Sequence, residues 1–478
     1  MRTYDQFYID GRWVDPVNGG QLYKVINPAT EEVAGTIRLA DEDDVASAIT
    51  AAHRAFASYS RTTPNERMQL ISAIAQIYQQ RLDDLAAAIS EEMGAPLYAV
   101  ARPMQAPLGL AHLQTILALA KDYPFKKQQG NTLLVKEPRG VCVLITPWNW
   151  PMNQIVCKVA PALLAGCTMV LKPSELAPFS SQIFTEILAA AGVPAGVFNM
   201  IQGDGAKIGP LMSSHPLVDM VSLTGSTRAG ISVAKNAAET VKVVSLELGG
   251  KSANIILDDA PLTKAVTDGV MGMMRNSGQS CNAPSRMLVP ASKLAEAEQI
   301  ASEALKTLVV GDPQSPSTTT GPIANARQYQ RVQSLIDKGI QEGARLVAGG
   351  PGRPEGLTRG YFAKPTIFSG VNNSMSIAQE EIFGPVLVMI PYDTEEQAIA
   401  IANDTVYGLS GFVYGGTIEH ARSVAERLRT GMVHLNGASI DPAAPFGGYK
   451  QSGVGREWGA AGIDEFVETK AIMGSPAA

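Results

Sequence analysis

The stretch VCVLITPWNWPMNQIVCKVAPALLAG, residues 141–166, decides the fold. Its first five residues are continuously apolar, which is typical of a strand that is buried on both faces of a parallel sheet. The segment 152–166 has helical character and ends at Gly166, a residue type that commonly terminates helices. A buried strand followed by a helix is the unit from which parallel α/β sheets are built.

The same unit repeats towards the C-terminus. Apolar segments predict further strands at 168–171, 197–201, 220–224 and 243–248, and helices are expected at 178–191 and 226–239. A second alternating set begins with the strands NIIL (254–257) and RMLV (286–289). Parallel strands joined by crossover helices form a doubly wound sheet, so we expect a Rossmann-like α/β part followed by a second α/β part.

The remaining segments have other patterns. Residues 41–120 are expected to be mostly helical, because apolar residues recur there at spacings of three and four. A Gln-Gln-Gly-Asn turn signal within 122–138 predicts a hairpin, and DEFVETKAIM (464–473) predicts a final extended strand.

Composition limits the classes of function. The chain has 478 residues, of which 45% are apolar and 18% charged, an ordinary globular mixture. Its net charge of −6 argues against nucleic acid and acidic membranes as partners. No secretory signal opens the sequence, and its four cysteines show no CxxC spacing, so we expect a reducing cytoplasm. The five histidines form no metal-ligand pattern, and no metal site is expected.

Polar or glycine residues follow four of the predicted strands. Parallel sheets bind their ligands beyond the carboxyl ends of the strands, so these residues are candidates for one shared site. They are Trp148, Asn149, Lys172, Glu175, Gly225, Ser226 and Glu247.

Each of these candidates also has a purely structural interpretation. Gly225 and Ser226 open a helix whose free N–H groups can bind phosphate, but a glycine turn alone is a weak signal. Lys172 and Glu175 could form a salt-bridged turn or contact a nucleotide ribose. Glu247 could be an exposed turn residue or a buried general base. The Asn149 amide could cap a turn or stabilise an oxyanion.

Cys281 differs from the other cysteines by its polar surroundings, GQSCNAPSR (278–286). A lone cysteine is usually an inert, small apolar residue, and Cys142, Cys157 and Cys167 fit this description because they lie in apolar runs. A free thiol is mostly protonated at neutral pH, so a nucleophilic Cys281 would need local activation.

Taken together, these segments resemble the NAD(P)-dependent aldehyde dehydrogenase superfamily, of the non-acylating, hydrolytic type. The resemblance covers essentially the whole chain, and the order of its motifs makes the signal strong although each motif alone is modest. The motifs are PWNWP (147–151), KPSE (172–175), LTGSTRAG (223–230), LELGGK (246–251), GQSC (278–281), EEIFGPV (380–386), PFGGYKQSGVGRE (445–457) and FVETK (466–470).

The resemblance implies an oxidoreductase that converts an aldehyde to a carboxylic acid. Cys281 is expected to attack the aldehyde, while the Asn149 amide and the Cys281 N–H hold the oxyanion of the thiohemiacetal. Hydride transfer leaves a thioester, and Glu247 activates the water that hydrolyses it. Lys158 and Glu457 match polar residues near the catalytic centre of the family.

The implied cofactor is NAD, with NADP possible. Glu175 favours NAD, because a carboxylate beside the ribose repels a 2′-phosphate. The residues that match cofactor contacts are Trp148, Lys172, Glu175, Gly225, Ser226, Glu381 and Phe383.

The resemblance also places a substrate channel. Only one of its expected residues is large and several are polar, so we expect a medium-sized tunnel for aliphatic or modestly functionalised aldehydes. The residues are Trp150, Asn153, Gln154, Cys157, Ser280, Asn282 and Ile440.

The resemblance also implies three structural parts. Residues 1–119 and 139–250 are expected to bind NAD, 251–466 to form the catalytic domain, and 120–138 with 467–478 to form a small β oligomerisation arm. Exposed strand edges are normally covered, so a homodimer or homotetramer is expected.

Three other functions stay open. A semialdehyde dehydrogenase that transfers the acyl group to coenzyme A commonly lacks the glutamate found here at 247. An inactive NAD-binding structural protein would not need Cys281, Glu247 and Asn149 together. A cysteine hydrolase without a cofactor would need a base, and no histidine lies in the neighbouring motifs.

Overall fold

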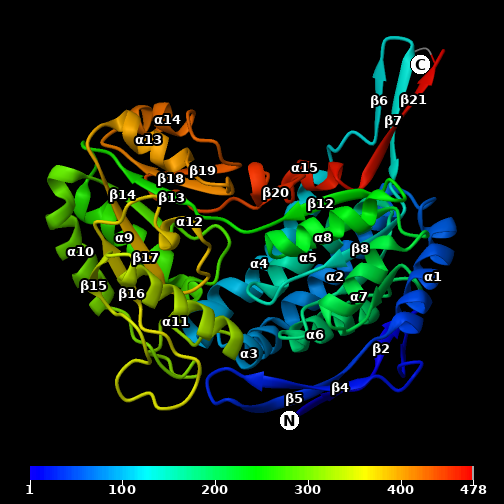
Figure 1. Cartoon of the computed structure of the whole chain (residues 1–478). Coiled ribbons are helices and arrows are strands. Elements are labelled where there is room, and N and C mark those ends of the chain that lie inside the picture. The colour runs from blue at the N-terminus through cyan, green and yellow to red at the C-terminus, as the bar shows by residue number, and fades with distance from the viewer. Residues whose placement is uncertain (476–478) are drawn as a thin grey trace.

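The computed structural model describes residues 1–475, and most of the chain lies in two α/β parts with a projecting β arm (Figure 1). The last residues of the expected arm, 476–478, lie outside the described residues. Within 1–475, no helix combines the length and apolar character needed to cross a bilayer.

The first sheet has eight strands. The five central strands, β12 to β10, run parallel, and β20, β2 and β3 are added at the edges in antiparallel pairs. The spatial order is β20 (Gly453–Val454), β12 (Val243–Glu247), β11 (Met220–Thr224), β8 (Val141–Ile145), β9 (Thr168–Lys172), β10 (Phe198–Met200), β2 (Phe7–Ile9) and β3 (Arg12–Val14).

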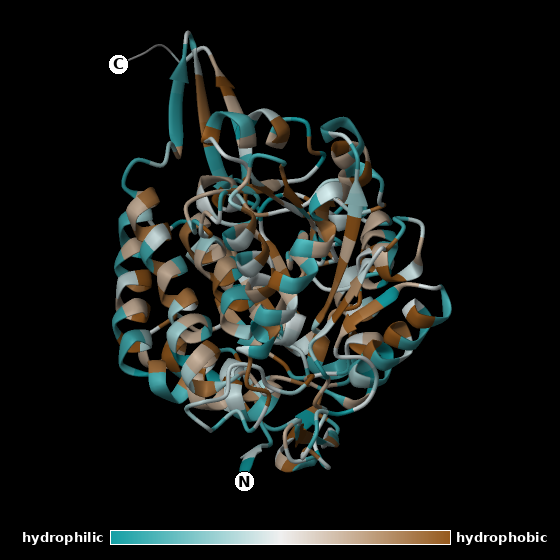
Figure 2. Ribbon diagram, turned by 90° about the vertical axis from the view of Figure 1, so that its left-hand side faces the viewer, coloured by the Kyte–Doolittle hydropathy of each residue, from teal (hydrophilic) through white to brown (hydrophobic). Residues whose placement is uncertain are grey.

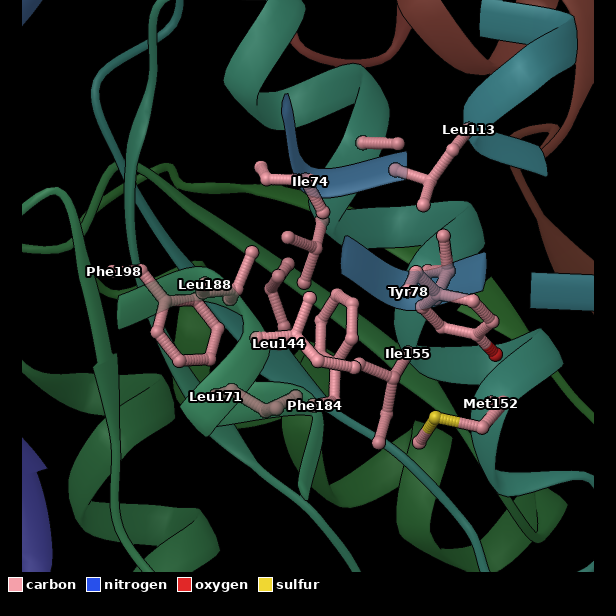
Figure 3. Close-up of a cluster of buried hydrophobic side chains, with 14 of the residues drawn as sticks. Ile74, Tyr78, Leu113, Leu144, Met152, Ile155, Leu171, Phe184, Leu188 and Phe198 are labelled. Atoms are coloured by element: carbon pink, nitrogen blue, oxygen red, sulfur yellow. The ribbon is translucent and has the colours of Figure 1, made fainter. Parts of the chain in front are cut away.

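Strand β8 shows why this sheet is covered on both faces. Its side chains alternate, so that Cys142 and Leu144 enter one apolar cluster while Val141 and Val143 enter another. The first cluster is built with α5 (Pro151–Ala165), α6 (Pro178–Ala190) and the N-terminal helices (Figure 3). The second is built with α1 (Glu42–Tyr59), α7 (Gly205–Ser214) and α8 (Thr227–Ala238). The continuous apolar run therefore predicted a doubly wound sheet correctly.

The second sheet has seven strands, all parallel except for the edge strand β15. Helices α9 (Leu262–Met274) and α10 (Leu294–Lys306) cover one face, while α11 (Ala326–Gln341), α13 (Glu395–Asn403) and α14 (Ile418–Ala425) cover the other. The strand order is β15 (Arg345–Ala348), β16 (Thr366–Ser369), β17 (Val386–Tyr392), β14 (Arg286–Pro290), β13 (Ala253–Ile256), β18 (Ser410–Tyr414) and β19 (Met432–Leu435). The strands inside the molecule are largely hydrophobic, as Figure 2 shows.

The N-terminal segment and the arm also follow their sequence patterns. The predicted helical region contains α1, α2 (Pro64–Gln80), α3 (Leu82–Met93), the π-helical segment Leu97–Gln105 and α4 (Ala106–Ala120). The arm pairs β6 (Lys126–Gln129) with β7 (Thr132–Pro138), and β7 with β21 (Val467–Met473). A further three-stranded sheet of β1 (Arg2–Tyr4), β5 (Glu32–Leu39) and β4 (Gln21–Asn27) lies near the N-terminus (Figure 1).

One short strand joins the two parts. Residues 453–454 belong to the segment expected to form the catalytic domain, yet β20 pairs with β12 at the edge of the first sheet. Gly453 lies opposite Glu247, and the Leu248 N–H donates a hydrogen bond to the Ser452 carbonyl (2.9 Å). The predicted domain boundaries stay predictions, but the last part of the chain contributes to both sheets.

Candidate active site

The candidate residues that follow strands lie at one edge of the first sheet. In the parallel register, Ile145 lies opposite Lys172, and Thr224 lies opposite Glu247. All these strands therefore end at the same level, where the segments carrying Asn149 and Ser226 begin.

A left-handed turn fixes the loop that carries Cys281. Asn276, Ser277 and Gly278 all have positive φ angles, a conformation that costs an ordinary residue of order 1–3 kcal/mol. The Asn276 side chain offsets this strain, because its carbonyl accepts a hydrogen bond from the Gln105 amide (3.1 Å). A Cβ on Gly278 would lie 2.1 Å from the Gly384 carbonyl oxygen, so only glycine fits there.

Asn149 is bonded to this loop from both its backbone and its side chain. Its carbonyl accepts a hydrogen bond from the Asn276 amide (3.0 Å). Its own side-chain amide donates to the Gln279 carbonyl (3.0 Å). A side-chain amide has two N–H groups, so one proton of the buried Asn149 amide is left for another acceptor near Cys281.

Cys281 is half-buried, whereas the other three cysteines are buried. It packs against a small cluster of Cys157, Leu409, Phe446 and Trp458. Burial raises the pKa of the Cys281 thiol, and the negative charges of Glu381 and Glu247 raise it further. The protein alone therefore holds Cys281 as a thiol, close enough to both carboxylates to sense their charge.

Glu247 is a buried carboxylate without a hydrogen-bond partner. Its side chain is 2% exposed, and neither carboxylate oxygen has a partner among the described residues. Burial raises the pKa of Glu247 well above its ordinary value, and the charge of Glu457 adds to this while Lys158 opposes it. A carboxylate with a raised pKa is a stronger base than an ordinary glutamate, which suits the role of a general base.

Lys158 and Glu457 form a buried ion pair behind Glu247. The Lys158 ammonium contacts the Glu457 carboxylate and donates a hydrogen bond to the Ser222 hydroxyl (3.0 Å). Burial opposes the charge of Lys158, but Glu457, Cys157 and Glu247 together outweigh it and raise the pKa of the lysine. The second oxygen of Glu457 accepts a hydrogen bond from the Cys157 thiol (3.4 Å). The structure thus pairs the two residues with each other, and both lie within electrostatic reach of Glu247.

The expected adenine-side contacts lie at the strand ends. The buried Lys172 ammonium donates to the Glu175 carboxylate (3.1 Å), which is itself partly exposed. The Ser226 hydroxyl caps α8 by accepting the Ala229 N–H (3.3 Å). A Cβ on Gly225 would meet only the Leu223 side chain, at 3.9 Å, so Gly225 is not tightly enclosed where α8 begins, and the free N–H groups of such a helix start can bind phosphate.

The expected nicotinamide-side contacts come from the second α/β part. The Gly250 N–H donates to the Glu381 carboxylate (3.1 Å), and a Cβ on Gly249 would lie 2.4 Å from that carboxylate. Burial raises the pKa of Glu381 to about 7. The Phe383 and Trp148 rings meet edge to face with centroids 5.4 Å apart. This segment lines one small hollow together with Ser280, so it reaches the cysteine loop. The Glu381 carboxylate and the two aromatic rings fit a dinucleotide that lies across the edge of the sheet.

The expected channel residues fall into different surroundings. The Trp150 indole N–H donates to the Ser280 hydroxyl (2.7 Å). The Asn153 carbonyl is bonded to the His112 ring (2.7 Å), whose pKa burial lowers to about 4. This amide is therefore engaged inside the protein by a neutral histidine.

Other predicted channel residues lie at different depths. Gln154 and Cys157 are buried, Asn282 is half-buried, and Ile440 is 38% exposed in the loop after β19.

Sequence reasoning missed several residues of this site. Asn276 and Gln105 position the loop, and His112, Leu409 and Trp458 surround the predicted channel. The Asn-Ser-Gly triplet before the cysteine was the available signal, because asparagine and glycine tolerate the left-handed conformation.

Comparison with known proteins decides the family. A sequence model described as "Aldehyde dehydrogenase family" matches residues 13–472. The chain belongs to the aldehyde dehydrogenase family. This aldehyde dehydrogenase is an oxidoreductase that converts aldehydes to carboxylic acids with NAD(P)+, so the predicted family, fold class, reaction and cofactor are confirmed.

Individual relatives are similar over nearly their whole length. A 3-succinoylsemialdehyde-pyridine dehydrogenase of Pseudomonas sp. is 58% identical over 474 residues, which cover 99% of both chains. The crystal structure of a cysteine-to-alanine mutant of aldehyde dehydrogenase C from Pseudomonas syringae, complexed with NAD+ and octanal, superposes with a TM-score of 0.98 at 53% identity, covering 99% of this chain and 97% of that one. The crystal structure of a Mycobacterium tuberculosis aldehyde dehydrogenase complexed with NAD+ superposes with a TM-score of 0.96 at 40% identity, covering 98% of both chains.

The exposure and pKa of Cys281 lead to a first prediction. Iodoacetamide should alkylate Cys281 and spare the three buried cysteines. Because the pKa of Cys281 is raised, the thiolate fraction and the alkylation rate should increase steadily from neutral to mildly alkaline pH without levelling off. Peptide mapping by mass spectrometry would follow the modification. Labelling of Cys142, or a rate that is already constant at neutral pH, would contradict the structure.

Proposed function

We propose that Cys281, Asn149 and Glu247 perform the two halves of the aldehyde dehydrogenase reaction. The observation that supports this most directly is the unpaired, buried Glu247 carboxylate beside the loop of the only cysteine that is not fully buried. A buried charge without a partner is costly, so its presence at a strand end is the mark of a functional group.

In the first half, the Cys281 thiol gives up its proton to water as its sulfur bonds to the aldehyde carbon, and the carbonyl oxygen becomes an oxyanion. The free N–H of the Asn149 amide and the Cys281 backbone N–H stabilise this charge, an effect worth about 3–4 kcal/mol per donor in comparable sites. A nicotinamide held beside the Trp148 and Phe383 rings would supply the acceptor for the hydride that this carbon must lose. The collapse of the oxyanion to a carbonyl leaves a thioester on Cys281.

In the second half, the Glu247 carboxylate takes a proton from water, and the resulting hydroxide attacks the thioester carbon. The carbon–sulfur bond breaks, the carboxylic acid leaves, and the sulfur of Cys281 is free again. The Lys158–Glu457 pair lies within electrostatic reach of Glu247, and we propose that it helps to set the charge of that carboxylate.

The substrate is proposed to be an aldehyde with a medium-length aliphatic chain or a neutral aromatic end. Among the predicted channel residues only Trp150 is large, and its indole N–H is already bonded to Ser280. Leu409, Phe446 and Trp458 add apolar surface around Cys281. The relatives named for octanal and for a pyridine semialdehyde fit such a channel.

A series of straight-chain aldehydes, one pyridine semialdehyde and one charged aldehyde tests this proposal, with NADH formation and the acid product measured together. We expect kcat/KM to rise towards medium chains by about 10-fold or more, since each buried CH2 contributes about 0.8 kcal/mol. Strict preference for the charged aldehyde would contradict the substrate class. Acyl-CoA in place of the acid, when coenzyme A is supplied, would support the acyl-transfer alternative.

Glu175 is proposed to select NAD+ over NADP+. Replacing Glu175 with glutamine removes the charge that repels a 2′-phosphate and leaves Lys172 free to attract it. We expect kcat/KM for NADP+ relative to NAD+ to rise by about 10-fold, which corresponds to about 1.4 kcal/mol. Glu186→Gln on α6 is the control and should leave the ratio unchanged. If the kcat/KM ratio for NADP+ over NAD+ stays the same in Glu175→Gln, Glu175 does not select the cofactor.

The arm and the cysteines bear on the oligomeric state of the enzyme and on its cellular compartment. The arm of β6, β7 and β21 has strand edges suited to pairing with a second copy, so we propose a homodimer or homotetramer. All four cysteines are free thiols, which supports a reducing, cytoplasmic location.

A further inference from the structure

A polar hollow lies at the start of two strands of the second sheet. It is lined by Lys251 and Ser252 before β13, Ser410 in β18, Arg286 in β14 and the loop that carries Thr405. Its volume of about 10 Å³ is room for one water-sized or monatomic group. None of these residues belongs to the mechanism proposed above.

Three hydrogen-bond donors in the lining have no partner. The Lys251 ammonium and the hydroxyls of Ser252 and Ser410 are buried and unbonded among the described residues. Ala253 lies opposite Gly411 in the parallel register, so Ser252 and Ser410 are side by side at the preceding level. A lysine ammonium can only donate, and a serine hydroxyl can turn to donate, so the three groups together suit an acceptor.

Positive charge gathers around the hollow. Arg286 is buried there and donates to the backbone carbonyls of Lys251 and Ala402. Lys450 lies close enough to sense both Arg286 and Arg429.

These cations lack close counter-charges. None of Lys251, Arg286, Lys450 and Arg429 has a carboxylate within 4.0 Å among residues 1–475. The acids that act on Lys251 or Arg286 from further away are Glu380, Glu381 and Asp404.

We propose that this hollow binds a monatomic anion of the chloride type, which accepts hydrogen bonds from Lys251, Ser252 and Ser410. A neutral water would satisfy the donors but would leave the buried ammonium beside Arg286 without a counter-charge. Burial, and then Arg286, lower the pKa of Lys251 to about 7, and an anion would reverse this shift.

The bound anion would also steady the catalytic segment. Lys251 directly follows Gly250, whose N–H holds the Glu381 carboxylate. Leu409 lines the hollow and packs in the cluster around Cys281. An anion here would therefore fix the backbone behind the cofactor and cysteine contacts without touching either.

The test combines crystallography with thermal unfolding of the full-length enzyme. Crystals soaked in bromide should show an anomalous peak beside the Lys251 ammonium. In solution, replacing gluconate with chloride at constant ionic strength should raise the Tm of the unmodified enzyme by about 2 °C or more. Lys251→Met should lose both the peak and the chloride-dependent shift.

Two further variants separate anion binding from a general salt effect. Lys235→Met makes the same change at an exposed site on α8 and should retain the shift. Ser410→Ala removes one donor and should weaken the chloride dependence while still folding. A density peak without anomalous signal, or the same chloride shift in Lys251→Met and the unmodified enzyme, would overturn the proposal in favour of a bound water.

Discussion

Replacing Cys281 with alanine should lower kcat/KM for aldehydes by at least about 10⁴-fold, because removing a covalent nucleophile leaves only binding and oxyanion stabilisation. The half-buried sulfur is the group that would turn the aldehyde into a thiohemiacetal, and a methyl group cannot form this bond. Initial rates of NADH formation measure the loss. NAD+ binding, followed by quenching of tryptophan fluorescence, should stay within a few-fold because the expected cofactor contacts are untouched.

The matched control for this variant is Cys142→Ala. Cys142 is buried in β8, so its replacement should lower the Tm by a small amount while leaving kcat/KM nearly unchanged. An active Cys281→Ala enzyme, or an equal loss of activity in both variants, would show that the reaction does not pass through the thiol at 281.

Replacing Glu247 with glutamine should separate the two halves of the reaction. Glutamine is similar in shape but cannot take a proton from water, and general-base catalysis contributes typically 10²–10⁴-fold. Steady-state turnover should fall by about that factor. A rapid burst of NADH equal to the active sites should remain, because thioester formation does not need Glu247. Stopped-flow absorbance measures the burst.

The pH dependence provides a second readout of the same variant. The pKa of Glu247 is raised, and only the deprotonated carboxylate can act as a base. Thioester hydrolysis in the unmodified enzyme should therefore accelerate as pH rises through this raised pKa, and the residual hydrolysis in Glu247→Gln should lose this acceleration. Glu239→Gln, at the end of α8, is the charge-matched control. Loss of the burst together with turnover would assign Glu247 to the first half instead.

Much of the fold was predictable because its strands are buried on both faces. The apolar run at 141–145 has no alternation, and this pattern alone indicates a parallel strand between two layers of helices. The two-residue strand β20 was not predictable. Its pairing with β12 depends on contacts across two hundred residues of sequence, and a Gly-Val dipeptide carries no periodic signal.

The site was predictable where a residue's neighbours in sequence are also its neighbours in space. Asn149, Lys172, Ser226 and Glu247 were predicted to lie at one edge of the sheet because each follows a strand and parallel strands end together. The left-handed turn at Asn276 depends instead on a hydrogen bond from Gln105, far away in the chain.

For a similar reason, the sequence could not predict which charged groups of the site lack a partner. The isolation of the Lys251 ammonium, like that of the Glu247 carboxylate, is a property of the packed interior and has no counterpart in the sequence.

The pairing of β20 with β12 also has a consequence for biosynthesis. The ribosome makes residues 1–452 before β20 exists, so the edge of β12 beside Glu247 stays unsealed until residues 453–454 have been added. A prematurely terminated polypeptide would expose this edge together with that of β7, whose partner β21 is also missing. Chains that stop before residue 453 should therefore be inactive and readily recognised by chaperones and proteases, and a nascent chain gains its catalytic power only after β20 has emerged.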